Sequence, residues 1–317
     1  MKTFDEIYEE LQSADNSELE NTWKEAKKEN QEARKKAIVI CLIIDIIVVT
    51  LLFKLIFSSI YGIAFTLMFG LVFNIIIFAT ITAFSSASKK NIEFITKYKN
   101  IVINKLINNF YDNLEYFPHK QMPEYIYEQL KYEEYNKYDS DDYFEALINN
   151  KYSIQMAEVL TKEERTYKDK DGETKKEVIT KFHGLFAKIE MDKSINSKLR
   201  IGQNGSIFSR KALKMDSSEF EKYFDVEASD KIIGMQLLTA DVMEELIDFI
   251  NKTKMKYDIF IENSELYLRF HSGTMFEFLD FKKELLDREL IQKYFYMLNF
   301  TYNLSNKLIT VINDTSI

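Results

Sequence analysis

The apolar residues of this chain gather in two long stretches, about 37–57 and about 60–84, joined by a short segment rich in serine. Each stretch reaches the roughly 20 residues that a membrane-spanning helix needs. The pattern therefore predicts a two-helix transmembrane hairpin over residues 37–84. Lysines and arginines flank the hairpin at both ends, whereas the connecting turn has no charge. By the positive-inside rule, we expect a multi-pass protein of the cell (inner) membrane with both termini in the cytoplasm.

The residues before the first apolar stretch are charged and read as helix. Ser17 is followed three positions later by Glu20, which is typical of a capping box at a helix start. No helix-breaking residue follows before the apolar stretch. We expect one continuous helix from Ser17 to about Phe57, and a cytosolic N-terminal helical segment over residues 1–36.

A second helical segment is predicted after the hairpin. Apolar residues keep near-helical spacing over residues 85–117, so this segment is interpreted as a helical stalk that continues to about Leu114. Pro118 and Pro123 then interrupt the helical pattern. They mark the start of a cytosolic domain over residues 118–317.

The domain after the prolines mixes strand and helix patterns. Residues 152–160 alternate between apolar and polar positions, and residues 161–180 are typical of a long charged hairpin with Asp171-Gly172 at its tip. Thr239 begins an amphipathic helix, and two strands are expected around Asn263-Ser264. Strands and helices that do not strictly alternate favour an α+β fold with a largely antiparallel sheet.

Composition and charge narrow the class of function. The net charge of −8 and the pI near 5.2 argue against a nucleic-acid binder, because the phosphate backbone selects basic surfaces. The single cysteine excludes a disulfide within the chain. Nucleotide-binding, zinc-protease and serine-hydrolase motifs are absent from the sequence, and the three histidines are far apart. The sequence thus predicts no catalytic residue, no cofactor and no metal ligand, and leans away from an enzyme.

Two acidic segments were weighed as cation sites. Residues 169–174 superficially resemble a calcium loop, but they lack the spaced acids that close one, so the hairpin interpretation is preferred. Residues 139–142 hold three aspartates that would bind a divalent cation weakly. A solvated turn or a helix cap is the preferred interpretation of that cluster.

Asp45 is a carboxylate inside the first apolar stretch. At 1.5 Å per residue it lies about 13 Å from Lys36, and Asn74 lies about 15 Å from Phe84 at the same end of the second stretch. We therefore expect a membrane helix contact in which Asp45 and Asn74 face one another, or meet their copies across an oligomer. One alternative is a single tolerated carboxyl near the inner boundary. The other, a proton relay, is disfavoured because the apolar stretches hold no second acid to which Asp45 could pass a proton.

Tyrosines are frequent after the prolines. Tyrosine is enriched at interfaces, so the run forms a possible interaction surface, whose members include Tyr125, Tyr127, Tyr132 and Tyr135. The same residues could instead pack this segment on the sheet, which is the interpretation we prefer.

Several short motifs in the second half of the chain suggest a family. They are F-x-G-L-F at residues 182–186, D-S-x-E-F at residues 216–220, and L-T opening a helix at residues 238–239. In these motifs, and in its two preceding apolar stretches, the chain resembles the bacterial family called domain of unknown function 3137 (DUF3137). The resemblance implies a membrane-associated bacterial protein of no established activity, and it brings no catalytic residues.

These observations lead to two functional hypotheses. The first is a non-enzymatic, membrane-anchored binding or scaffold module in the cytoplasm, whose partners would be the lipid bilayer and a protein partner or a homo-oligomer. The alternative is an enzyme or small-molecule sensor with an acid- and tyrosine-lined site on the sheet. A pocket lined by acids of perturbed pKa favours the second hypothesis, and a flat apolar patch favours the first.

Overall fold

The computed structural model describes residues 1–55, 68, 71–72, 74–81, 89–168, 170, 173–203, 212–278 and 280–314. The chain divides into two compact units. One unit comprises Met1–Glu9, Lys99–Glu277 and Arg288–Ile317, and the other comprises Glu10–Tyr98 and Phe278–Asp287. Each unit is described by itself.

Among the described residues of the unit that contains Glu10–Tyr98 are the helices α2 (Ser17–Leu55) and α4 (Lys89–Tyr98). The predicted helix start at Ser17 is confirmed. Ion pairs join the two helices, with Lys90 to Glu25 at 3.3 Å and Lys97 to Glu18 at 2.7 Å. The Asn30 amide also donates to Asn91 at 2.8 Å.

The predicted transmembrane hairpin is contradicted by the structure. Within the described ranges, no helix combines the length and the apolar character that crossing a membrane requires. α2 is long, but its first half, up to Lys36, is rich in charged residues. The multi-pass membrane localisation, which depended on the hairpin, is wrong on the same finding. The connecting turn that we predicted at 58–62 lies outside the described residues.

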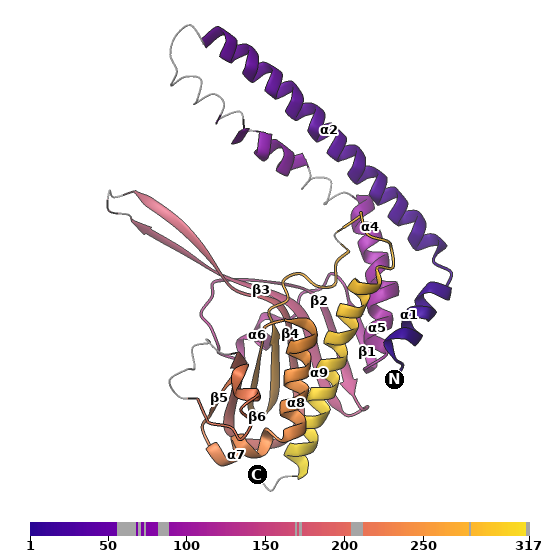
Figure 1. Ribbon diagram of the computed structural model, residues 1–317. Coiled ribbons are helices and arrows are strands. Elements are labelled where there is room, and N and C mark those ends of the chain that lie inside the picture. Colours follow the sequence, from indigo (N-terminus) through magenta and orange to yellow (C-terminus); the bar gives the residue numbers. More distant parts are fainter. Residues whose placement is uncertain are drawn as a thin grey trace. The chain divides into compact units, whose positions relative to one another are not determined.

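The larger unit contains a six-stranded sheet whose described pairs are all antiparallel, as the order of the strand and helix patterns along the chain predicted (Figure 1). Its strands are β1 (Asp112–Phe117), β2 (Lys137–Ile148), β3 (Tyr152–Lys168), β4 (Thr174–Gln203), β5 (Phe224–Ala228) and β6 (Tyr257–Phe270). They follow the order β1-β2-β3-β4-β5, and β6 pairs with β4.

The outer parts of β3 and β4 extend beyond the rest of the sheet as a two-stranded ribbon (Figure 1). Lys168 pairs with Thr174 near its end, which confirms the predicted charged hairpin. The predicted tip, Asp171-Gly172, lies outside the described residues.

Strand β6 doubles back on itself at Asn263, which has a φ of 55°. The His271 backbone N–H donates to the carbonyl of Lys256 at 2.8 Å, and the rings of Tyr257 and Phe270 are 6.1 Å apart. These contacts join the two ends of β6, as in a hairpin. The prediction of two strands around Asn263-Ser264 is therefore confirmed.

Helices cover one face of this sheet. α8 (Ala240–Thr253) is capped by Thr239, whose side chain accepts from the Val242 N–H, as predicted. It packs with α9 (Arg288–Asp314) against the sheet, where Phe249 and Phe300 stack with ring centroids 3.9 Å apart (Figure 1). α7 (Lys231–Leu237) precedes α8 and is capped by Asp230, whose side chain accepts from the backbone N–H groups of Ile232 and Ile233.

The opposite face is covered by the short helix α6 (Glu124–Glu128) and the residues after it. Tyr127 reaches the sheet and contacts Phe182 and Phe186, with ring centroids 6.0 and 4.9 Å apart. This aromatic layer forms part of the hydrophobic core.

The stalk region differs from its prediction. Helical structure ends with η1 (Lys99–Ile103) and α5 (Asn104–Asn108), and residues Asp112–Phe117 form the edge strand β1. Asparagines favour helix ends and turns over helix interiors, and Asn113 adopts a φ of 51°. β1 then pairs with β2, so tertiary pairing decides the conformation of this segment.

Candidate functional site

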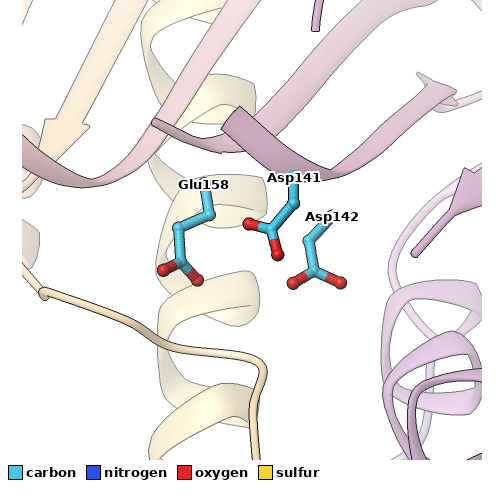
Figure 2. Close-up of side chains that lie close together, drawn as sticks. All are labelled: Asp141, Asp142 and Glu158. Carbon is cyan, nitrogen blue, oxygen red and sulfur yellow. The ribbon is translucent and has the colours of Figure 1, made fainter. Parts of the chain in front are cut away.

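The carboxylates of Asp141, Asp142 and Glu158 lie together beside the sheet (Figure 2). Asp141 of β2 pairs with Glu158 of β3. Successive residues of a regular strand face opposite sides, so a regular β2 would turn Asp142 away from Asp141. The register shifts between Asp141 and Phe144, however, and Asp142 has a φ of 53°. This bulge brings oxygens of the three carboxylates within 4.8 Å of one another.

A buried lysine provides positive charge at these carboxylates. Lys99 belongs to η1, a π-helical turn, and such turns are frequent at functional sites. Its Nζ lies 2.6 Å from Asp142, 3.5 Å from Asp141 and 3.9 Å from Glu277. The Tyr116 hydroxyl also donates to Asp142. The side chains of Lys99 and Asp142 are 1% and 0% exposed, so their ion pair is inside the protein.

Burial raises the pKa values of two carboxyls in this cluster, Asp142 and Glu158. Removal from water raises the pKa of Asp142 to about 7, although Lys99 opposes the shift. Burial likewise raises the pKa of Glu158 to about 8, against a hydrogen bond of 2.8 Å from the Met275 N–H. Burial acts to lower the pKa of Lys99, but the carboxylates, Asp142 foremost, raise it overall. One ammonium therefore lies within 3.9 Å of three carboxylates, those of Asp141, Asp142 and Glu277.

The cluster has two kinds of chemistry open to it. Its ligands are all oxygen, the donor set that calcium and magnesium prefer, but the Lys99 ammonium already occupies the position of a counter-cation beside Asp142. Carboxyls with a pKa near 7 or 8 are also suited to proton transfer. Asp141 is 40% exposed at its side chain, and it gives the cluster contact with solvent.

A different part of the sheet carries an open cleft of about 1030 Å³. Its walls are the segment 129–132 after α6, the 198–200 part of β4, the residues from β5 to the start of α7, and both arms of β6. Charged side chains of both signs line it, together with aromatic rings from Tyr132, Phe260 and Tyr267.

Tyr132 is the centre of a stack of arginines and aromatic rings at this cleft. The guanidinium carbon of Arg200 lies 4.2 Å from the centre of the Tyr132 ring, and that of Arg269 lies 4.4 Å from it. Arg200 donates to the Tyr132 hydroxyl. Arg269 is fully buried and bonds to Glu133 at 2.8 Å. Cation–π contacts of this kind hold the guanidinium groups in fixed orientations.

The structure brings Asp45 and Asn74 together. The Asn74 side-chain amide donates to the Asp45 carboxylate, and the carbonyl of Asn74 accepts from Cys41 Sγ at 3.7 Å. The contact is present, but the membrane setting in which we predicted it is not found in the described residues.

The four predicted tyrosines do not share one surface. Tyr125 is 62% exposed, whereas Tyr127 is 3% exposed and belongs to the core. Tyr135 packs against Tyr127, with ring centroids 5.8 Å apart, and Tyr132 carries the arginine stack. Tyr127, Tyr132 and Tyr135 thus pack on the aromatic core beside the sheet, whereas Tyr125 points outward.

Sequence reasoning missed the groups that make these sites. Lys99, Arg200 and Arg269 were not singled out, because a lone basic residue in a mixed segment is ordinarily a surface residue. One signal was present in the sequence: Glu158 interrupts the apolar run of its strand, and a carboxylate at a core position is unusual. The interpretation of residues 139–142 as a solvated turn or a helix cap is wrong, because these residues lie within β2 and Asp142 is buried.

The chain is similar to one described protein family over part of its length and to a solved structure of low sequence identity. No curated protein matches the chain. Among solved structures, the chain is similar to the crystal structure of the mycobacterial trehalose monomycolate transport factor A, TtfA, at 7% identity and a TM-score of 0.34. The similarity covers 67% of this chain and 94% of that chain. Residues 180–309 match the family described as "Protein of unknown function (DUF3137)". This match supports the resemblance to DUF3137 over residues 180–309, which include most of β4 and the elements from β5 into α9.

Proposed function

We propose that this chain is a non-enzymatic binding module whose small-molecule ligand occupies the cleft beside Tyr132. The cleft itself is the observation that supports the proposal. Its volume of about 1030 Å³ is at the upper end of the range typical of ligand sites. It combines aromatic surface from Phe260 and Tyr267 with charged groups that can orient a ligand. A protein partner or a homo-oligomer stays a prediction.

The acids of the cleft support binding over catalysis. Glu262 is paired with Lys198 at 2.5 Å, and Glu265 is paired with Lys188 at 2.9 Å. The pKa of Glu265 is lowered, because hydrogen bonds from Tyr267 and Lys188 outweigh the opposing effect of burial. A carboxylate held in its charged form by such partners is a weak proton donor near neutral pH.

A fragment screen on the full chain tests this proposal. Saturation-transfer NMR would be recorded with a set of neutral, cationic and anionic fragments. Lys231 is an exposed residue that lines the cleft, so Lys231→Trp places an indole in the cleft without altering the core. We expect a group of fragments to bind the wild type and to lose their signal in this variant.

Lys252→Trp is the matched control, since Lys252 is exposed on α8 and does not line the cleft. It should retain every fragment signal. The proposal is wrong if no fragment binds, or if the bound fragments are unaffected by Lys231→Trp.

The raised pKa values of Asp142 and Glu158 favour a second candidate, an acid- and tyrosine-lined site for proton transfer or sensing, with Tyr116 as the tyrosine. It ranks lower because Lys99 already neutralises Asp142. Labelling of Glu158 in the folded chain by a hydrophobic carbodiimide, which reacts with protonated carboxyls, would favour it. Absence of labelling at pH 6 would count against it.

A further inference from the structure

Arg200 is a guanidinium held in place at the wall of the cleft. It is half-buried, and it lies against two aromatic rings, 4.2 Å from the centre of Tyr132 and 5.3 Å from that of Phe260. Burial lowers the pKa of Arg200, which reflects the cost of keeping its charge away from water. A guanidinium held by stacking presents its N–H groups in one plane, the arrangement that matches carboxylate and phosphate oxygens.

Arg269 is a second guanidinium at the Tyr132 ring, close to Arg200. Arg269 is 0% exposed and also stacks on Phe182, at 4.3 Å from the ring centre. Its Nη2 is bonded to Glu133, but in the described part of the chain its Nε and Nη1 have no hydrogen-bond partner. A buried guanidinium that is only partly hydrogen-bonded adds positive potential to this region.

The side chains that line the cleft include four basic groups, Lys131, Lys198, Arg200 and Lys231, and three acidic ones, Glu227, Glu262 and Glu265. Glu262 and Glu265 are paired with lysines, and Glu133 is paired with Arg269. Glu227 and Asp258 both favour the charged form of Arg200, and Asp258 also bonds to His271 at 2.9 Å. Two lysines, Lys131 and Lys231, line the cleft, and among the described residues their ammonium groups have no partner.

From this arrangement we infer that the ligand of the cleft is a small organic anion, a carboxylate or a phosphate, recognised by Arg200 with Lys131 and Lys231. The inference rests on the proposed binding function and names the ligand class. The apolar part of the ligand would pack on Phe260 and Leu130, which line the same cleft.

Calorimetric titration of the full chain tests the inference with four probes. Benzoate and phenyl phosphate carry the two anionic groups, phenol is the neutral analogue and benzylamine the cationic one. We expect one or both anions to bind at least about tenfold more tightly than phenol, the factor that corresponds to about 1.4 kcal/mol. Benzylamine should bind no better than phenol. The ratio of benzoate to phenyl phosphate distinguishes the carboxylate from the phosphate as the preferred group.

Arg200→Gln should reduce the affinity for the anions by at least about tenfold and should leave phenol unchanged. Arg165→Gln is the matched control, because Arg165 is exposed on the β3–β4 ribbon. If circular dichroism shows that Arg200→Gln does not fold, the double variant Lys131→Gln with Lys231→Gln replaces it in the test, since both lysines are exposed. This double variant should lower the affinity for the anions by a similar factor.

The inference is overturned if phenol or benzylamine binds as well as the anions, or if neither set of substitutions changes anion affinity. These failures can be told apart from failure of the proposed function. A cleft that binds only neutral or cationic fragments, with loss in Lys231→Trp, refutes the anion and retains the binding module. A cleft that binds nothing refutes both.

Discussion

Glu158 offers the sharpest test of the buried carboxylate cluster. Its side chain is 8% exposed, it accepts from the Met275 N–H at 2.8 Å, and it faces the carboxylates of Asp141 and Asp142. His183 is the nearest basic side chain outside the Lys99 network, at 3.8 Å. Burial raises the pKa of Glu158 from 4.5 to about 8. Between pH 4.5 and about 8, Glu158 therefore keeps its proton in the folded state and loses it in the unfolded state.

The sign and size of the effect follow from this difference. The raised pKa of Glu158 gives stability that is fully present below pH 4.5 and is lost as pH rises through about 8. Each pH unit within this window weakens the folded state by about 1.4 kcal/mol. Between pH 5 and pH 9 the loss attributable to Glu158 amounts to about 4 kcal/mol.

Glu158→Gln removes the ionisation and keeps an oxygen that can accept from the Met275 N–H. The free energy of unfolding would be measured by urea denaturation with circular dichroism at each pH from 5 to 9. We expect the stability of the variant relative to wild type to increase by about 4 kcal/mol across this range. Glu244→Gln, at an exposed position of α8, controls for the loss of one carboxyl. Profiles of wild type and Glu158→Gln that run parallel would refute the reasoning.

Two further predictions concern packing and charge. Asp142→Asn removes the closest counter-charge of the buried Lys99 and should lower the free energy of unfolding by about 3 kcal/mol, measured by urea denaturation. The double variant Asp142→Asn with Lys99→Met removes both charges and should regain part of that loss in the same assay. Gly184→Ala should destabilise by at least about 2 kcal/mol, because its Cβ would lie 1.8 Å from the Phe270 carbonyl oxygen. Gly273→Ala has open space around its Cβ and a φ of 63°, so only about 1 kcal/mol is expected, and equal melting-temperature shifts for the two glycine variants would contradict the packing argument.

Local sequence patterns correctly predicted much of the secondary structure of the larger unit. The alternation of residues 152–160 predicted a strand in β3, the Thr239 side chain predicted the start of α8, and the turn at Asn263 predicted a hairpin. Each of these features depends on neighbours in sequence, because a cap or a tight turn is formed within a few residues. The antiparallel character of the sheet followed from such segments.

Short-range reasoning failed where a distant partner decides the conformation. Residues Asp112–Phe117 were expected to end a helix, but pairing with β2 makes them a strand. The apolar stretches predicted a membrane hairpin from composition alone, and the described helices do not have the required length and apolar character.

The candidate sites were decided only by the tertiary structure. Lys99 meets Asp142 across 43 positions in the chain, and Arg200 meets Tyr132 across 68. A sequence identifies charged and aromatic side chains. The free energy of holding each charge in the folded protein, however, depends on its burial and on the partner that folding brings to it. Asp142 therefore read as a solvated acid in the sequence, and it became a buried member of an ion pair because a bulge in β2 and a π-helical turn bring the two charges together.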